Sequence, residues 1–119
     1  AEDEPDIRAN LARLLRLEGY RVSTAADGGA AMAAVAAERP DLVLSDLMMP
    51  GVDGLALLAW LRADPRTADL PVVLLTARAD GGDVQEGLAA GADAYITKPY
   101  HRDELLRRLR ALLPGAGAA

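Results

Sequence analysis

The hydrophobic and polar positions of this 119-residue chain alternate between the spacing of helices and that of buried strands. Predicted helices, most of them ended by glycine or proline, run from Pro5 to Glu18, Gly28 to Glu38, Asp53 to Ala63, Asp83 to Ala90 and His101 to Leu113. Short, mostly apolar runs predict strands at Tyr20 to Thr24, Leu42 to Asp46, Val72 to Thr76 and Ala94 to Thr97. This alternation predicts an α/β domain with a doubly wound parallel sheet.

The apolar residues at helical spacing also predict which side of each helix faces the core. Asp53 is expected to cap the third helix, because a short carboxylate can accept from the first backbone N–H groups. The residues expected to face inward are Ile7, Leu11, Leu14, Leu15, Met32, Val35, Leu57, Leu58, Leu61, Leu105, Leu109 and Leu112.

The start of the chain lacks an element that the pattern requires. An acid cluster, Glu2-Asp3-Glu4, should follow a strand, yet only Ala1 precedes it. Without that strand the centre of the sheet has a gap, and unpaired buried backbone groups are costly. We therefore infer that an apolar strand lies upstream in the native protein. We expect Ala1 to Asp3 at the C-terminal end of a central strand position.

Composition narrows the class of protein. The length fits one domain, with residues 1–113 as the domain and 114–119 as a flexible tail or the start of a linker. The chain has no cysteine and one histidine, which excludes disulfides and multi-histidine metal sites. No apolar run reaches the roughly 20 residues of a membrane span, and no signal peptide is visible, so a cytoplasmic location is expected. A net charge of −5 argues against direct nucleic-acid binding.

The polar residues with candidate chemistry stand where predicted strands end. Asp46 and Thr76 each end a mainly apolar run, and Lys98 follows the last strand as the only lysine of the chain. In a parallel sheet these ends meet at one crevice, together with Glu2 and Asp3. Three close carboxylates repel one another unless a cation lies among them, and oxygen ligands of this kind suit Mg²⁺. A carboxylate can also attack phosphorus to give an aspartyl phosphate.

Each of these residues has a plainer interpretation when taken alone. Glu2 and Asp3 can be helix N-terminal acids favoured by the helix dipole, and Asp46 can be a capping aspartate. Thr76 can be an ordinary strand residue, and Lys98 a solvated surface charge. The functional interpretation gains weight because all of them are expected at the same edge of the sheet.

Four longer segments point to a known family. They are Glu2-Asp3-Glu4-Pro5, Asp46-Leu47-Met48-Met49-Pro50-Gly51-Val52-Asp53-Gly54, Thr76-Ala77-Arg78, and Ala90-Gly91-Ala92-Asp93-Ala94-Tyr95-Ile96-Thr97-Lys98-Pro99. Together they closely resemble the motifs of response-regulator receiver domains, over the whole chain except the absent first strand. The resemblance implies a five-stranded parallel sheet in the order 2-1-3-4-5, with helices on both faces.

The resemblance also implies a role for each residue of the site. Asp46 would be the phosphoacceptor, Asp3 would bind Mg²⁺ directly, and Glu2 would act largely through water. The remaining implied roles are a metal-binding backbone carbonyl at Met48, phosphoryl contacts from Thr76 and Lys98, a switch formed by Thr76 with Tyr95, and tuning of hydrolysis by Met48 and Arg78. Tyr95 alone can also be a half-buried strand aromatic.

The implied function is a phosphorylatable switch in a two-component system. A histidine kinase or phosphotransfer domain would donate the phosphoryl group, and a downstream effector domain or protein would respond. The chain would phosphorylate itself and dephosphorylate slowly rather than act as an enzyme, with no membrane partner. Phosphorylation-dependent dimerisation is compatible with the family, although Ala94 stands where many DNA-binding members carry a second aspartate.

Other functions remain as alternatives. A pseudo-receiver would act as a phosphorylation-independent interaction module, but the full set of site residues argues against it. An aspartyl-phosphate phosphatase usually carries a second acid two residues after the nucleophile, where this chain has Met48. A flavin-binding protein would need a phosphate-binding loop rich in Ser, Thr or Gly after a strand, and none is present.

Overall fold

The computed structural model describes residues 1–49, 51–76, 91–97 and 100–113. Its elements are α1 (Pro5–Leu17), α2 (Gly28–Ala37), β1 (Val43–Asp46), α3 (Gly54–Ala63), β2 (Val72–Thr76), β3 (Ala94–Thr97) and α5 (Arg102–Leu112). The predicted helix at 83–90 and the predicted tail at 114–119 lie outside the described residues.

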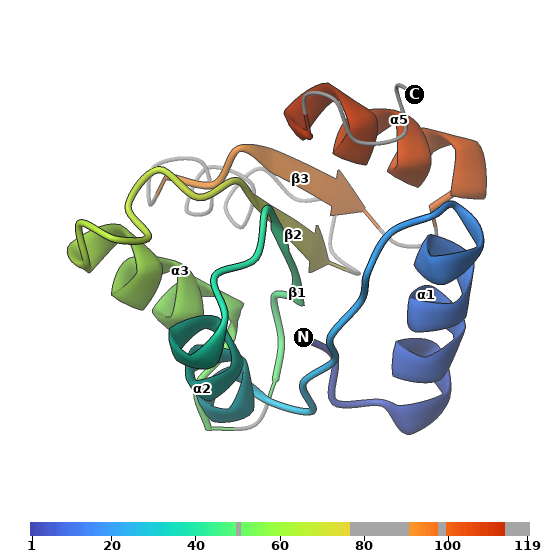
Figure 1. The fold of residues 1–119 in the computed structure, drawn as a ribbon. Coiled ribbons are helices and arrows are strands. Elements are labelled where there is room, and N and C mark those ends of the chain that lie inside the picture. Colours follow the sequence, from blue (N-terminus) through green and yellow to red (C-terminus); the bar gives the residue numbers. More distant parts are fainter. Residues whose placement is uncertain (50, 77–90, 98–99, 114–119) are drawn as a thin grey trace.

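The described strands form one parallel sheet in the order β1-β2-β3. Val43 lies opposite Val72, and Val73 lies opposite Ala94, so the three strands start at the same level. Helices α2 and α3 cover one face of the sheet, and α1 and α5 cover the other (Figure 1). The predicted α/β fold with a doubly wound parallel sheet is confirmed.

Each face of the sheet has its own apolar core. The face under α2 and α3 is closed mainly by Leu57, Leu58 and Leu61, whose exposure is 0%. The face under α1 and α5 is closed by Leu105 and Leu109, with the leucines of α1 packed less tightly around them. Since β2 is buried along its whole length, its continuous apolar sequence matches a strand covered on both faces.

Capping aspartates set the starts of two helices. The side chain of Asp53 accepts a hydrogen bond from the Ala56 N–H at 2.8 Å, as predicted for α3. Asp27 does the same for α2 through the Ala30 N–H at 2.7 Å. In both helices the cap satisfies one of the first backbone donors, which have no partner within the helix.

The prediction of a strand at Tyr20 to Thr24 is wrong in this structure. These residues connect α1 to α2 without strand pairing, along the same side as the start of the chain (Figure 1). A strand needs a hydrogen-bonded neighbour, and none of the described strands pairs with these residues. The bond described there is from the Glu2 N–H to the Ala25 carbonyl at 3.0 Å, just beyond the predicted strand.

The inward position predicted for Ile7 is also wrong, because its side chain is 38% exposed. Ala12, at 4% exposure, marks the buried side of α1 instead. Ile7 precedes Ala12 by five residues, which places it about 140° round the helix from the most buried position. The small alanine was a weaker signal of burial than the larger isoleucine.

Candidate functional site

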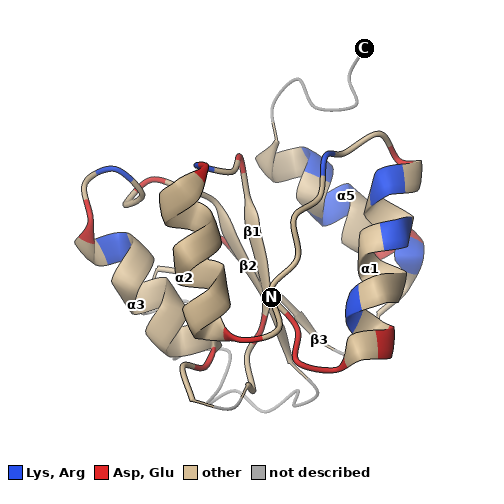
Figure 2. Ribbon diagram, turned by 60° about the horizontal axis from the view of Figure 1, so that its bottom comes forward, with Lys and Arg blue, Asp and Glu red and all other residues tan. Residues whose placement is uncertain are grey.

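The C-terminal ends of β1 and β2 bring the first predicted site residues together. Asp46 ends β1 and is 8% exposed, and Thr76 ends the neighbouring strand β2 at 0% exposure. Glu2, at 3% exposure, lies at the same end of the sheet. Figure 2 shows the acidic residues of the chain start beside the N-terminus at this edge. The predicted convergence of strand ends is confirmed for these residues.

Backbone hydrogen bonds hold the start of the chain against β1. The Asp46 N–H donates to the Ala1 carbonyl at 2.9 Å, and the Glu2 N–H donates to Ala25 on the other side. The guanidinium of Arg8, one turn into α1, donates to the Glu2 carbonyl at 2.9 Å. Hydrogen bonds to three other segments therefore hold Ala1 and Glu2, which fixes the position of Glu2 and of the next residue, Asp3.

Three carboxylates meet in what we call the acidic pocket, formed by Glu2, Asp3 and Asp46. One oxygen from each lies within 4.8 Å of the others. Asp3 is the most exposed of the three, so the pocket opens to solvent on its side. Hard oxygen ligands at this separation fit Mg²⁺, which accepts a few carboxylates and keeps several waters.

The loop after β1 leaves little room for change around Asp46. The Leu47 N–H donates to the Leu75 carbonyl at 2.7 Å, and the Gly54 N–H donates to the Leu47 carbonyl at 2.9 Å. A Cβ at Gly54 would lie 2.5 Å from the Asp46 carbonyl oxygen. The first turn of α3 thus packs directly on the backbone of Asp46, which only a glycine allows.

One backbone donor lies close to the Asp46 carboxylate. The Met48 N–H donates to Asp46 Oδ1 over a long 3.4 Å, while the Met48 side chain is 67% exposed. A backbone N–H at this place can support negative charge on the carboxylate or on a group attached to it. The described contacts do not test the implied role of the Met48 carbonyl.

Burial and nearby carboxylates shift the pKa of a group beside the acidic pocket. Burial raises the pKa of the Tyr100 hydroxyl, and the charges of Glu2 and Asp46 raise it further. Sequence reasoning did not single out Tyr100, although an aromatic directly after Lys98-Pro99 was a visible signal.

The other predicted residues differ in what the structure says of them. Thr76 lies opposite Thr97 in the β2–β3 pairing. Tyr95 is half-buried and packs against the core under α2 and α3. Lys98 and Arg78 lie outside the described residues, so their predicted roles are untested.

Comparison with known proteins decides the family. Residues 1–110 match the family model described as the response regulator receiver domain. The chain belongs to the response-regulator receiver domain family. It is 44% identical over 116 residues to the probable transcriptional regulatory protein TcrX of Mycobacterium tuberculosis, covering 98% of this chain and 49% of the relative. It is 50% identical to the transcriptional regulatory protein TcrA of the same species, covering 93% of this chain and 43% of TcrA.

Solved receiver structures have the same fold. Chemotaxis protein CheY4 of Vibrio cholerae superimposes with a TM-score of 0.89 at 33% identity, covering 94% of this receiver chain and 93% of CheY4. The receiver domain of sensor histidine kinase PA1611 from Pseudomonas aeruginosa gives a TM-score of 0.87 at 35% identity, covering 95% and 93% of the two chains. The PA1611 structure is described with a magnesium ion coordinated in the active site cleft.

Two further observations concern the length of the relatives and the possibility of a membrane span. The chain spans about half the length of the curated relatives that it matches. Within the part of the chain that the structure describes, no helix is both long and apolar enough to cross a bilayer.

Proposed function

We propose that this receiver domain accepts a phosphoryl group on Asp46 in a reaction that depends on Mg²⁺ at the acidic pocket. The observation that supports this most is the approach of three carboxylates within 4.8 Å at the end of β1, with Asp46 largely buried. Carboxylates so close repel one another, and a divalent cation offsets that repulsion. The family match and the magnesium-bound relative support the same assignment.

Each residue of the site has a distinct part in the proposed transfer. A carboxylate oxygen of Asp46 attacks the phosphorus of a phosphohistidine, forming a P–O bond while the P–N bond breaks and the imidazole leaves. Asp3 would hold Mg²⁺ directly, Glu2 would act largely through water, and the Met48 carbonyl would be the backbone ligand. When bound, Mg²⁺ supplies positive charge near the phosphoryl oxygens, where charge stabilisation and alignment do most of the catalysis.

The switch follows from what contacts the new phosphoryl group. The added group carries roughly one to two negative charges and strong acceptor oxygens. The Thr76 hydroxyl and the Lys98 ammonium then favour the arrangement in which they reach those oxygens, and Tyr95 follows Thr76. A phosphoryl group shifts the equilibrium only through such differential contacts.

The lifetime of the aspartyl phosphate depends on water reaching Asp46 in line. We propose that Met48 shields the phosphorus, because its thioether accepts hydrogen bonds only weakly and cannot orient water. Arg78 stays protonated and cannot act as a base. The phosphorylated domain is therefore expected to dephosphorylate more slowly than a Met48→Asn variant under identical Mg²⁺.

The proposed setting is a cytoplasmic two-component system. A histidine kinase or phosphotransfer domain is the donor, and an effector domain or protein is the recipient of the signal. The relatives TcrX and TcrA are named as transcriptional regulatory proteins, which supports an output in gene regulation. In this proposal residues 1–113 form the receiver domain, 114–119 begin a linker, and the domain itself contacts neither DNA nor a membrane.

The proposal is tested by measuring the intact mass of the domain after incubation with acetyl phosphate and Mg²⁺. The wild-type chain is expected to gain one phosphoryl group, and Asp46→Asn none. Asp41→Asn is the matched control, because it makes the same change at an exposed position just before β1. Phosphorylation of Asp46→Asn to the wild-type level would refute the assignment. No labelling of wild type would instead favour a pseudo-receiver.

A further inference from the structure

Sulfur in this chain is confined to three methionines, because the sequence has no cysteine. The three differ in how far solvent reaches them. Met48 is 67% exposed, whereas its neighbour Met49 is 8% exposed. Met32 is half-buried and packs against the core under α2 and α3. Oxidants in solution therefore meet the thioether of Met48 far more often than the other two.

The two methionines after β1 differ in exposure although they are adjacent in sequence. The Met49 side chain is largely enclosed, so an oxidant reaches its sulfur only when the loop opens. Oxidation of a buried methionine also places a polar sulfoxide in an apolar environment, which costs free energy. Met48 carries neither restriction, because its side chain already stands mostly in solvent. Exposure thus selects Met48 for oxidation.

The backbone of Met48 lies directly beside the acidic pocket. Its N–H donates to Asp46 Oδ1 at 3.4 Å, and Asp46 is only 8% exposed. Asp46 is also one of the three carboxylates whose oxygens lie within 4.8 Å of one another. A chemical change to the Met48 side chain is therefore made next to the carboxylate that the proposed function uses.

We propose that Met48 is a redox modification site, oxidised by hydrogen peroxide to the sulfoxide, and that this oxidation shortens the lifetime of the phosphorylated domain. In the oxidation the O–O bond of the peroxide breaks; one oxygen forms an S–O bond with the thioether, and the other leaves as water. The sulfur loses two electrons and the peroxide gains them. The modification is reversible, because methionine sulfoxide reductases restore the thioether. Only the effect on lifetime rests on the proposed function.

The effect on lifetime follows from hydrogen bonding. A thioether sulfur accepts hydrogen bonds only weakly, so Met48 shields the aspartyl phosphate without orienting water. A sulfoxide is polar, and its oxygen accepts a hydrogen bond from water. Hydrolysis requires a water in line with the phosphorus, and a side chain that positions water there accelerates it. Oxidation thus converts a shielding group into one that binds water beside Asp46.

The modification site is tested by treating the folded domain with hydrogen peroxide and following the masses of its peptide fragments. Met48 is expected to gain oxygen at least about fivefold faster than Met49, in keeping with exposures of 67% and 8%. Treatment in urea should remove the difference, because unfolding exposes both side chains. Equal rates at the two methionines in the folded domain would overturn the site.

The effect on lifetime is tested by phosphorylating oxidised and untreated domain with acetyl phosphate and then removing the donor. At one Mg²⁺ concentration, oxidised wild type is expected to dephosphorylate roughly threefold to tenfold faster, the range that one net hydrogen bond contributes. The rate of Met48→Leu should not change on peroxide treatment, because that variant has no sulfur at the position. Met49→Leu, the same change one position along, should respond as wild type does. Methionine sulfoxide reductase should restore the original rate.

The possible outcomes separate the parts of the proposal. An unchanged or longer lifetime in wild type oxidised at Met48 would overturn the effect of oxidation. An equal response of Met48→Leu and wild type would also overturn it, because another residue would then carry the effect. Absence of phosphoryl labelling in the untreated chain would refute the proposed function, and with it the effect on lifetime. The fragment masses decide the modification site independently of that result.

Discussion

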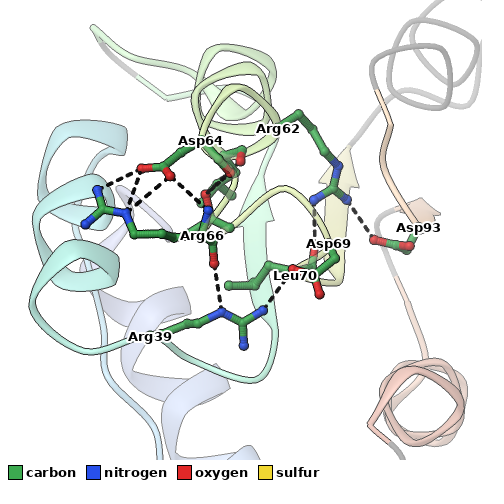
Figure 3. A network of polar contacts seen from close by, with 9 residues as sticks. Arg39, Arg62, Asp64, Arg66, Asp69, Leu70 and Asp93 are labelled. Carbon is green, nitrogen blue, oxygen red and sulfur yellow. Dashed lines mark hydrogen bonds and ion pairs between the residues drawn. The ribbon is translucent and has the colours of Figure 1, made fainter.

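The two ends of the sheet hold charged side chains in opposite ways. At the C-terminal ends of the strands, the acidic pocket concentrates three carboxylates within 4.8 Å. At the N-terminal ends, aspartate and arginine side chains form ion pairs with one another (Figure 3). We call this second group the arginine cluster; it comprises Arg39, Arg62, Asp64, Arg66, Asp69 and Asp93. Aspartates thus form ion pairs that hold the fold together at one end, and among the described residues they take part in a group of three carboxylates at the other.

Arg62 is the arginine of this cluster that belongs to α3. Its guanidinium donates to the Gly91 carbonyl at 2.7 Å, to the Leu70 carbonyl at 2.7 Å and to Asp93 Oδ2 at 2.9 Å. The same Asp93 oxygen accepts from the Val72 N–H at 2.8 Å. One side chain of α3 therefore ties together the approaches to β2 and β3. Arg62 therefore stabilises the fold at this end, whereas the acidic pocket brings together carboxylate oxygens of a kind that fits a cation.

Among the changes that test this contrast, the largest expected effect is a loss of folding stability at the arginine cluster. Arg62→Ala removes the donor of three carbonyl and carboxylate contacts and leaves Asp93 without that partner. Hydrogen bonds to charged groups contribute about 1.5–3 kcal/mol each, so a loss of about 2–3 kcal/mol is expected. Urea unfolding with and without Mg²⁺ measures it.

Arg66→Ala is the control for this change, because Arg66 is 86% exposed and pairs with Asp64 at the surface. It should change the unfolding midpoint little, since exposed ion pairs contribute little. An unfolding midpoint for Arg62→Ala equal to that of Arg66→Ala would show that the contacts of Arg62 contribute no more to stability than an exposed ion pair.

The next effect concerns the backbone that supports the acidic pocket. Gly54→Ala brings a methyl group to 2.5 Å from the Asp46 carbonyl oxygen and 2.9 Å from Leu47 Cα, so the loop must move. Overpacking of this kind costs about 1–3 kcal/mol. We expect lower stability together with weaker Mg²⁺ binding, measured by calorimetry.

Gly29→Ala provides the matched control, since its new methyl group would lie 3.4 Å from Asp27 Oδ1 and within 4 Å of no residue of the acidic pocket. It should leave Mg²⁺ affinity unchanged. Normal Mg²⁺ binding by Gly54→Ala would mean that the packing of α3 does not position Asp46.

Much of the fold follows from local pattern. Val72–Thr76 and Ala94–Thr97 have the predicted bounds, because buried strands are continuous apolar runs between polar ends. The convergence of Asp46 with the first acids follows from parallel topology alone. These features depend on the order of elements, which periodicity reveals directly.

Features that depend on distant neighbours were not predictable in the same way. Tyr20 to Thr24 has the composition of a strand, but strand formation also requires a paired neighbour, and these residues have none among the described strands. The arginine cluster joins residues up to 31 positions apart, such as Arg62 and Asp93, with no local pattern. Tyr100 was not predicted because only the fold brings its hydroxyl near the acidic pocket, although its place directly after Lys98-Pro99 was a visible signal.

The smallest expected effect is on how the stability of the arginine cluster depends on pH. A side-chain hydrogen bond from Arg66 lowers the pKa of Asp64 below its usual 3.8. A carboxylate with a lowered folded-state pKa stabilises the fold above its ordinary pKa, and that contribution is lost as the pH falls through the lowered value. Asp64→Asn should therefore reduce the loss of stability seen below about pH 4. Identical acid limbs for wild type and variant, measured by melting temperature against pH, would contradict this.

The most direct test of the contrast is the stabilisation of the domain by Mg²⁺. A site-bound ion at one hundred times its dissociation constant stabilises the folded state by about 2.7 kcal/mol. We expect wild type to show such a concentration-dependent rise in unfolding free energy, and Asp3→Asn to lose most of it. Asp69→Asn, which removes an exposed carboxylate from the arginine cluster, should retain the full rise. An unchanged rise in Asp3→Asn, or its loss in Asp69→Asn, would contradict a cation site at the acidic pocket.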